Sequence, residues 1–334
     1  MNVTLLSTGG TIASTETNAG AKPTQSGLEL LEAVPELKSY ATFSVESVAQ
    51  IPSFEMDAAT LEDIAGRVGE LDADPTVDAV VITHGTDTME ETAYYLDVTV
   101  QPETPVILTG AQRRPDEVSP DGPSNLLTAV RASEAFADRD ADGTFVAFDK
   151  ELYSARTVTK VHTSALEAFR SRNAGPVATV DRNDVVIHRP PRSETRPIET
   201  TSLMATVVTI KSGSAVTGDL LEAALENDTD GIVIEGTGLG NTTAGIADAV
   251  HDAIDAGVPV VVTSRCLEGR VAPVYGGDGG GERLREYGAI FADDLSAQQA
   301  RLRLALALEA FDDPEAIQAA FTSFDRSQSA TDQT

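Results

Sequence analysis

Short runs of apolar residues alternate in this chain with stretches whose apolar residues recur at helical spacing. In the first half, the apolar runs predict buried strands at Val3–Leu6, Ala79–Ile82, Val106–Leu108 and Phe145–Phe148. The stretches between them predict helices at Leu28–Val34, Ala58–Leu71, Glu90–Leu96 and Ser124–Ala137. Continuous apolar strands that alternate with helices are typical of a parallel sheet covered on both faces. The pattern therefore predicts an α/β fold.

The pattern breaks between residues 185 and 203, where three prolines stand among Arg, Ser, Glu and Thr. Prolines at this density interrupt regular structure, so this segment is interpreted as a linker or an excursion at a sheet edge. Beyond it, strands are predicted at Thr206–Ile210, Ile232–Ile234 and Val260–Thr263, and helices at Leu220–Leu225, Ala244–Ala256 and Ala297–Ala310. The predicted organisation is an N-terminal α/β domain (1–184), a linker (185–203) and a smaller C-terminal α/β domain (204–334).

The composition is strongly acidic, with 53 Asp and Glu against 24 Lys and Arg and a formal charge of −29. Such a surface repels nucleic acid and anionic membranes, because both require basic patches. Two interpretations stay open: a very soluble acidic protein, or one adapted to a high-salt cytoplasm in which salt screens the self-repulsion. Both concern the solvent and neither identifies a reaction.

Cys266 is the single cysteine, which excludes a disulfide framework and a cysteine-rich metal site. We expect it to be a small buried residue near the strand around Val260. No apolar run reaches the ~18 residues that a membrane span requires. The first residues contain neither a basic segment nor an apolar signal core, so a cytoplasmic protein is expected.

Two polar runs directly follow predicted strands, Ser7–Ser14 after the first and Thr83–Glu91 after the second. In open α/β sheets, ligands bind beyond the carboxyl ends of the strands. In the first run, Thr11 follows two glycines, which allow a sharp turn and a close approach of the backbone to a ligand. Thr11 is therefore a candidate nucleophile, and an ordinary strand-to-loop turn is the alternative.

In the second run, Thr86 and Asp87 place a hydroxyl beside a carboxylate. Asp87 could hold a substrate ammonium group, orient a lysine or only cap the following helix. His84 is interpreted as structural, because no serine and aspartate pattern accompanies it. Lys160 lies in an alternating, strand-like segment, where burial could turn it into a base toward a hydroxyl, although a surface lysine is the alternative.

Several motifs together carry a resemblance to a known family. Thr8–Ala13 and His84–Ala93 resemble the two signature motifs of the bacterial-type L-asparaginases. The similarity continues through Gly110–Arg113, Asp121–Leu126, Val158–Lys160 and Gly238–Asn241. The resemblance implies a two-domain fold with a larger, flavodoxin-like N-terminal sheet. It also implies hydrolysis of L-asparagine to L-aspartate and ammonia, with some activity on glutamine.

The resemblance assigns residue roles by motif. Thr11 would be the nucleophile that forms an acyl-enzyme, and Thr86, Asp87 and Lys160 would form a second catalytic unit. Asp87 would also bind the α-ammonium group of the substrate, Ser53 its α-carboxylate, and Asn241 would reach a site across a subunit interface. No metal or organic cofactor is implied. The family forms homodimers or homotetramers, so a homo-oligomer is expected.

Two positions depart from the family pattern. Members usually carry a tyrosine on the mobile loop after the nucleophile, but the loop Thr15–Gly27 contains none, and its hydroxyls include Thr17, Thr24 and Ser26. Phe54 stands where many relatives have a polar residue. Two alternatives to an asparaginase follow: an ammonia-releasing subunit of a tRNA-dependent amidotransferase, or a non-catalytic amino-acid sensor. The former carries an extra domain before the nucleophile motif, which is not expected here because Thr11 lies near Met1.

Overall fold

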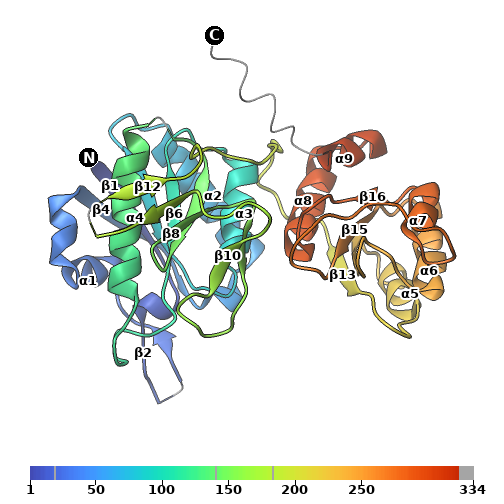
Figure 1. Cartoon of the computed structure of the whole chain (residues 1–334), viewed down its shortest axis with the longest axis horizontal. Helices are drawn as coiled ribbons and strands as arrows, with labels where there is room; N and C mark the ends of the chain where they lie inside the picture. Colours follow the sequence, from blue (N-terminus) through green and yellow to red (C-terminus); the bar gives the residue numbers. More distant parts are fainter. Residues whose placement is uncertain (19, 140, 183, 323–334) are drawn as a thin grey trace, which may run out of the picture. The chain divides into compact units, whose positions relative to one another are not determined.

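The computed structural model describes residues 1–322 except 19, 140 and 183. Within it the chain divides into two compact units, Met1–Pro197 and a second that begins at Ile198. The first unit contains the larger sheet and the second a smaller one, as the sequence predicts (Figure 1). The last part of the predicted C-terminal domain, 323–334, lies outside the described residues.

The first unit is built on an eight-stranded sheet with the order β12-β11-β8-β7-β6-β5-β1-β4. Five neighbouring strands are parallel: β1 (Asn2–Gly9), β4 (Thr42–Ile51), β5 (Ala79–Thr83), β6 (Val106–Thr109) and β7 (Thr144–Phe148). Numbered among themselves, they have the order 2-1-3-4-5, which is the flavodoxin-like doubly wound topology. The strand order reverses between β1 and β5.

The other three strands of this sheet are antiparallel. They are β8 (Glu151–Ser154), β11 (Ala178–Val180) and β12 (Val185–Ile187). The sheet is therefore mixed rather than wholly parallel. The sequence pattern placed residues 185–187 in the linker, but these three β-branched residues extend the sheet edge, where pairing with β11 satisfies their backbone groups.

Helices cover both faces of the parallel part. One face carries α1 (Gly27–Glu32) and α4 (Gly122–Ala137), whose leucines pack on Val3, Leu5 and Val81. The other face carries α2 (Ala58–Asp72) and α3 (Met89–Thr99) (Figure 1).

Short strands and 3₁₀ turns complete this unit. They are β2 (Ser14–Thr15), β3 (Lys22–Pro23), β9 (Val158–Lys160), β10 (Phe169–Ser171) and the 3₁₀ turns η1 (Thr11–Ala13), η2 (Pro35–Ser39) and η3 (Ser53–Glu55).

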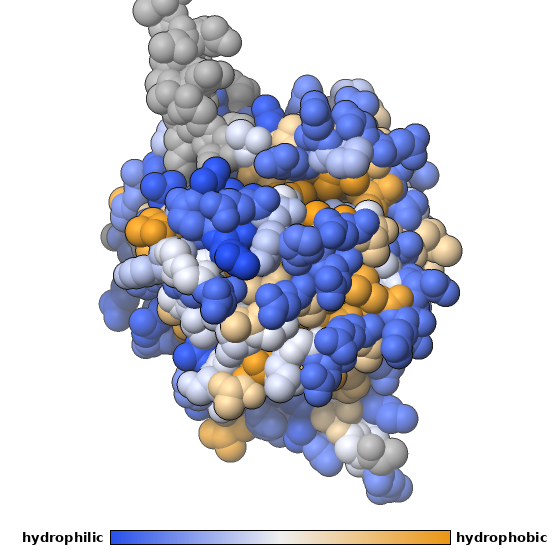
Figure 2. All heavy atoms as spheres, turned by 90° about the vertical axis from the view of Figure 1, so that its right-hand side faces the viewer, coloured by the Kyte–Doolittle hydropathy of each residue, from blue (hydrophilic) through white to orange (hydrophobic). Residues whose placement is uncertain are grey.

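The second unit has a four-stranded parallel sheet, β13 (Val207–Lys211), β14 (Gly231–Gly236), β15 (Val260–Ser264) and β16 (Ile290–Phe291). Its helices are α5 (Asp219–Glu226), α6 (Ala244–Asp255), α7 (Gly281–Tyr287), α8 (Ala297–Ala310) and α9 (Pro314–Ala320). Buried residues of α5, α6 and α7 form one core with the strands. The face of this unit seen in Figure 2 is mostly hydrophilic, with separate hydrophobic patches.

Two surface properties bear on the expectations from the sequence. Cys266 is exposed, which corrects the expectation that it is buried, because it follows the end of β15 in a turn rather than lying within the strand. No helix in the described part of the chain is long and apolar enough to cross a bilayer.

Candidate active site

The two polar runs meet at the point where the strand order reverses. Thr11 begins η1 directly after β1, and Thr86 lies between β5 and α3. A Cβ atom placed on Gly10 would lie 2.3 Å from the backbone N of Gly85, so the two backbones touch. Gly10 also has a φ of +78°, which favours glycine. This contact fixes the turn that carries Thr11 against the turn that carries Thr86.

Replacing Gly10 by alanine should therefore damage both folding and the site. The left-handed φ and the overlap with Gly85 should lower the free energy of unfolding by about 2–4 kcal/mol. Displaced backbone should also reduce kcat/KM at least about 100-fold. Gly66→Ala in α2, where a Cβ meets nothing within 4 Å, is the control and should leave both unchanged or slightly increase stability. Denaturant unfolding measures the change in stability, and steady-state kinetics measure the change in kcat/KM. The same stability and kcat/KM in Gly10→Ala and Gly66→Ala would contradict the prediction.

A third segment closes the site from the side of β4. Ser53 opens η3 just after β4, and a Cβ on Gly85 would lie 2.5 Å from the Ser53 Oγ. The Asp87 N–H donates to this Oγ at 3.2 Å, and the Thr88 hydroxyl donates to the Ser53 carbonyl at 2.7 Å. Ser53 is 4% exposed. The serine is thus held at the same edge as the two threonine turns.

Lys160 joins Thr86 and Asp87 from a distant part of the chain. Its Nζ donates to the Thr86 Oγ1 at 2.8 Å and pairs with the Asp87 Oδ1 at 2.6 Å. The backbone N–H of Lys160 donates to the buried Glu90 carboxylate at 2.9 Å, which anchors β9 to α3. The Lys160 side chain is 13% exposed, so the alternative of a free surface lysine is excluded.

Asp87 does not cap α3. The N-cap residue of that helix is Thr88, which makes no side-chain capping hydrogen bond. The Asp87 side chain is 58% exposed and faces Lys160 instead. Its carboxylate therefore remains accessible to a ligand while one oxygen holds the lysine.

Thr11, Ser53, Thr86 and Asp87 line one small cavity of about 230 Å³. Phe54 lies at this cavity with 70% of its surface exposed. Within the described residues no side chain hydrogen-bonds the Thr11 hydroxyl, so this hydroxyl is not committed to a structural contact. A larger cavity of about 570 Å³ lies in the second unit and contains none of these residues.

The segment after Thr11 forms a short hairpin from β2 and β3, in which the hydroxyls already have partners. Thr15 and Thr24 bond to each other at 2.8 Å, and Thr17 bonds to the Gly20 carbonyl. Ser26 caps α1. Beside Thr11, the buried Ser14 hydroxyl lines the same cavity and donates to the Gly10 carbonyl at 2.7 Å. Ser14 is a site residue that the sequence motifs did not single out, although it belongs to the first polar run.

His84 is fully buried under the site, in agreement with its interpretation as structural. Its Nδ1 lies 2.7 Å from the Gly85 carbonyl and its Nε2 lies 3.0 Å from the Thr92 hydroxyl. Burial lowers the pKa of His84 to about 4, and the Gly85 carbonyl opposes this only in part. The ring is therefore neutral near pH 7 and supports the turn that carries Thr86.

This burial predicts an acid-dependent loss of stability. Because the pKa of His84 is about 4 when folded and about 6.5 when unfolded, only the unfolded chain takes up this proton between those values. The free energy of unfolding should fall by about 2–3 kcal/mol more in the wild type than in His84→Gln between pH 7.5 and 4.5. Denaturant titrations at constant salt measure this fall in the free energy of unfolding. His251→Gln, at a partly exposed histidine of the second unit, is the control and should keep the wild-type pH dependence. The same dependence in His84→Gln would contradict the prediction.

A buried carboxylate holds the next loop. Asp121 is 8% exposed and accepts the N–H groups of Gln112 and Arg113 at 2.8–3.1 Å. Asn125 donates to both Asp121 and the Gly110 carbonyl. These contacts shape the loop after β6, which adds Gln112 and Arg114 to the cavity wall. Their sequence signal was the motif Asp121–Leu126, which carried only a family resemblance.

Asn241 belongs to the second unit and is not part of this cavity. Its Oδ1 accepts the Gly281 N–H at 3.1 Å, which ties the turn after β14 to the start of α7.

Among the described residues, no three His, Cys, Asp or Glu side chains come together as metal ligands would.

Comparisons with known proteins agree with this architecture. The family profile "Asparaginase, N-terminal" matches residues 2–193, and "Glutaminase/Asparaginase C-terminal domain" matches residues 206–321. The chain is therefore an α/β protein of the amidohydrolase class, and it belongs to the asparaginase/glutaminase family.

Individual relatives cover nearly the whole chain. L-asparaginase 2 of Bacillus subtilis is 33% identical over 97% of this chain and 86% of the relative. A glutamyl-tRNA(Gln) amidotransferase subunit of Halobacterium salinarum is 35% identical over 94% of this chain and 77% of the relative. The crystal structure of a probable cytoplasmic L-asparaginase from Campylobacter jejuni matches with a TM-score of 0.85 and 34% identity, over 97% of this chain and 99% of that one.

Proposed function

We propose that this protein is an L-asparaginase, which hydrolyses the side-chain amide of L-asparagine to L-aspartate and ammonia. The observation that carries the proposal is the contact of Lys160 with both Thr86 and Asp87 in the cavity that Thr11 also lines. A cavity of about 230 Å³ suits a small amino acid rather than a larger ligand. No metal or cofactor enters this mechanism.

Substrate binding in this proposal uses the charged ends of the amino acid. The exposed carboxylate of Asp87 takes the α-ammonium group. The Ser53 hydroxyl accepts the Asp87 N–H and so has its own proton left to donate to the α-carboxylate. The backbone N–H of Asp87 is bonded to the Ser53 hydroxyl, so the two residues hold their binding groups at a fixed spacing for the two charges of the substrate.

Acylation then begins with attack of the Thr11 Oγ on the amide carbon. An amide is a poor electrophile, so the attack requires loss of the hydroxyl proton and N–H donors for the developing oxyanion. The proton reaches the leaving nitrogen, ammonia departs, and an ester of Thr11 remains. Lys160 stabilises negative charge on Thr86, or on a water held by it, and this unit activates the water that hydrolyses the ester.

A second candidate is release of ammonia from glutamine. It is favoured by the similarity to the amidotransferase subunit. Ammonia and product amino acid should be measured for L-asparagine, L-glutamine and D-asparagine over a range of salt concentrations. Faster release from L-asparagine supports the proposal. Faster release from glutamine favours the second candidate, and binding of aspartate without turnover of either amide favours a sensor.

We infer that the protein acts as a cytoplasmic homo-oligomer, a dimer or tetramer. The cytoplasmic location is supported by the name of the Campylobacter jejuni protein. The homo-oligomer is supported by the motif resemblance, which implies that Asn241 reaches a site across a subunit interface. Light scattering tests the oligomeric state. Asn241→Ala should lower activity when the sites are completed between subunits.

A further inference from the structure

The hairpin after Thr11 is bonded directly to the turn that presents this residue. The N–H groups of Thr24 and Gln25 both donate to the Ala13 carbonyl, at 2.8 and 2.9 Å, and Ala13 is the last residue of η1. Ser14 bonds back to Gly10 from the first residue of β2. A displacement of the hairpin therefore moves the backbone on either side of Thr11.

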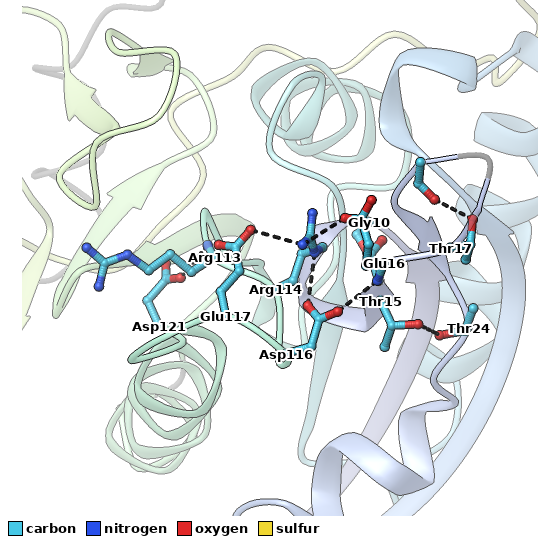
Figure 3. A network of polar contacts seen from close by, with 12 residues as sticks. Gly10, Thr15, Glu16, Thr17, Thr24, Arg113, Arg114, Asp116, Glu117 and Asp121 are labelled. Atoms are coloured by element: carbon cyan, nitrogen blue, oxygen red, sulfur yellow. Dashed lines mark hydrogen bonds and ion pairs between the residues drawn. The ribbon is translucent and has the colours of Figure 1, made fainter.

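One guanidinium group connects this hairpin to the opposite wall of the cavity. The Arg114 Nη2 pairs with the Glu16 carboxylate of the hairpin at 2.9 Å, and its Nε pairs with Asp116 at 2.9 Å. Asp116 in turn accepts the Glu16 N–H at 2.8 Å, and Glu117 lies 3.5 Å from Nη2. Figure 3 shows the Arg114 side chain, on the loop that also carries Asp116 and Glu117, directed toward Glu16 of the hairpin.

The charges in this cluster are unbalanced, because three carboxylates surround one guanidinium. The Arg114 side chain is only 22% exposed, whereas the carboxylates are 35–60% exposed. The Glu16 N–H and the guanidinium both lower the pKa of Asp116, so this carboxylate stays ionised near pH 7. Without the arginine, the three carboxylates would repel one another.

We propose that Arg114 is a positioning residue for the reaction: its ion pairs with Glu16, Asp116 and Glu117 hold the hairpin against the cavity and thereby set the position of Thr11. Arg114 and Glu117 line the same cavity as Thr11. The hold is electrostatic, so it depends on salt. The segment Thr15–Gly27, which contains the hairpin, has no tyrosine. The kinetic part rests on the proposed function, whereas the part about the hairpin does not.

Hydrogen exchange of the hairpin is the test that is independent of activity. In Arg114→Gln, the Glu16 amide should exchange about tenfold faster than in the wild type, relative to amides in β1, because the ion pairs are replaced by repulsion. Salt should act in opposite directions in the two proteins. In the wild type, salt weakens the attraction and should speed the relative exchange of the Glu16 amide. In Arg114→Gln, salt screens the repulsion and should slow the relative exchange of this amide.

Three further variants separate electrostatics from packing. Arg114→Lys keeps the charge but not the forked geometry and should recover part of the protection. The double variant with Glu16→Arg and Arg114→Glu keeps one arginine among three carboxylates and should return to within about threefold of the wild-type exchange rate. Arg67→Gln is the matched control, because Arg67 pairs with Glu46 and Glu70 away from this cavity and should leave the hairpin unchanged.

Kinetics complete the test. We expect Arg114→Gln to lower kcat/KM for asparagine about tenfold and the charge-exchanged double variant to restore most of it. Equal hairpin exchange in wild type and Arg114→Gln, or the same direction of the salt effect in both, would overturn the proposal. Failure of the double variant to recover protection would also overturn it. A wild type that releases no ammonia from asparagine would refute the proposed function and leave the exchange result standing.

Discussion

Replacing Thr11 by alanine should lower kcat for asparagine hydrolysis at least about 10⁴-fold, because the hydroxyl that forms the acyl-enzyme is removed. Thr11 starts a 3₁₀ turn and no described side chain bonds to its hydroxyl, so the fold should lose little stability. The measurement is ammonia release in steady state, together with aspartate binding by calorimetry, which should change less than about threefold.

A control variant and a search for the acyl-enzyme test this prediction further. Thr128→Ala removes a threonine hydroxyl that bonds to the Ser124 carbonyl within α4, outside the cavity, and should keep wild-type turnover. Rapid acid quenching of the wild type with asparagine should reveal protein carrying one aspartyl group, and Thr11→Ala should show none. An acylated Thr11→Ala variant would assign the nucleophile to another hydroxyl, and the cavity offers Ser14, Ser53 and Thr86 as alternatives.

Replacing Lys160 by methionine should lower kcat about 10³-fold, which corresponds to the loss of one charged group that stabilises a developing anion. The variant removes the 2.8 Å contact to Thr86 and the 2.6 Å ion pair with Asp87. Asp87 is 58% exposed, so water can solvate the carboxylate that is left and stability should change little.

Deacylation should be affected most in this variant if Lys160 and Thr86 activate the water. A burst of ammonia of one equivalent per site, followed by slow turnover, is the expected time course. Lys38→Met, at an exposed lysine of η2, is the matched control and should show no burst above that of the wild type. Equal activity of both lysine variants would remove Lys160 from the mechanism.

The positions of the strands along the chain were predictable where the strands are buried on both faces of the sheet. Val3–Leu6, Ala79–Ile82 and Val106–Leu108 are unbroken apolar runs or nearly so, and each lies within a central parallel strand. The ten-residue strand β4 escaped prediction, because as an edge strand it is only half buried and mixes Ser, Glu and Gln with its apolar residues. Helix α9 is too short to show a period.

The contents of the site were predictable from motifs, but its connections were not. The resemblance named Thr11, Thr86, Asp87, Lys160 and Ser53, and the structure brings all five to one edge of the first sheet. Asn241 lies in the other unit. The ion pairs of Arg114 left no readable signal, because a charged residue in a loop has the same local sequence whether or not it has a partner.

The sequence alone determined which residue types follow each strand, and so which hydroxyls and carboxylates could reach a strand end. That much is local, because periodicity and glycine conformation act over a few residues. Tertiary structure decided which strand ends become neighbours. The reversal of strand order between β1 and β5 brings Gly10 onto Gly85, and β9 carries Lys160 to Thr86 across 74 residues. Such contacts depend on sheet pairing and core packing between distant segments, which no local pattern encodes.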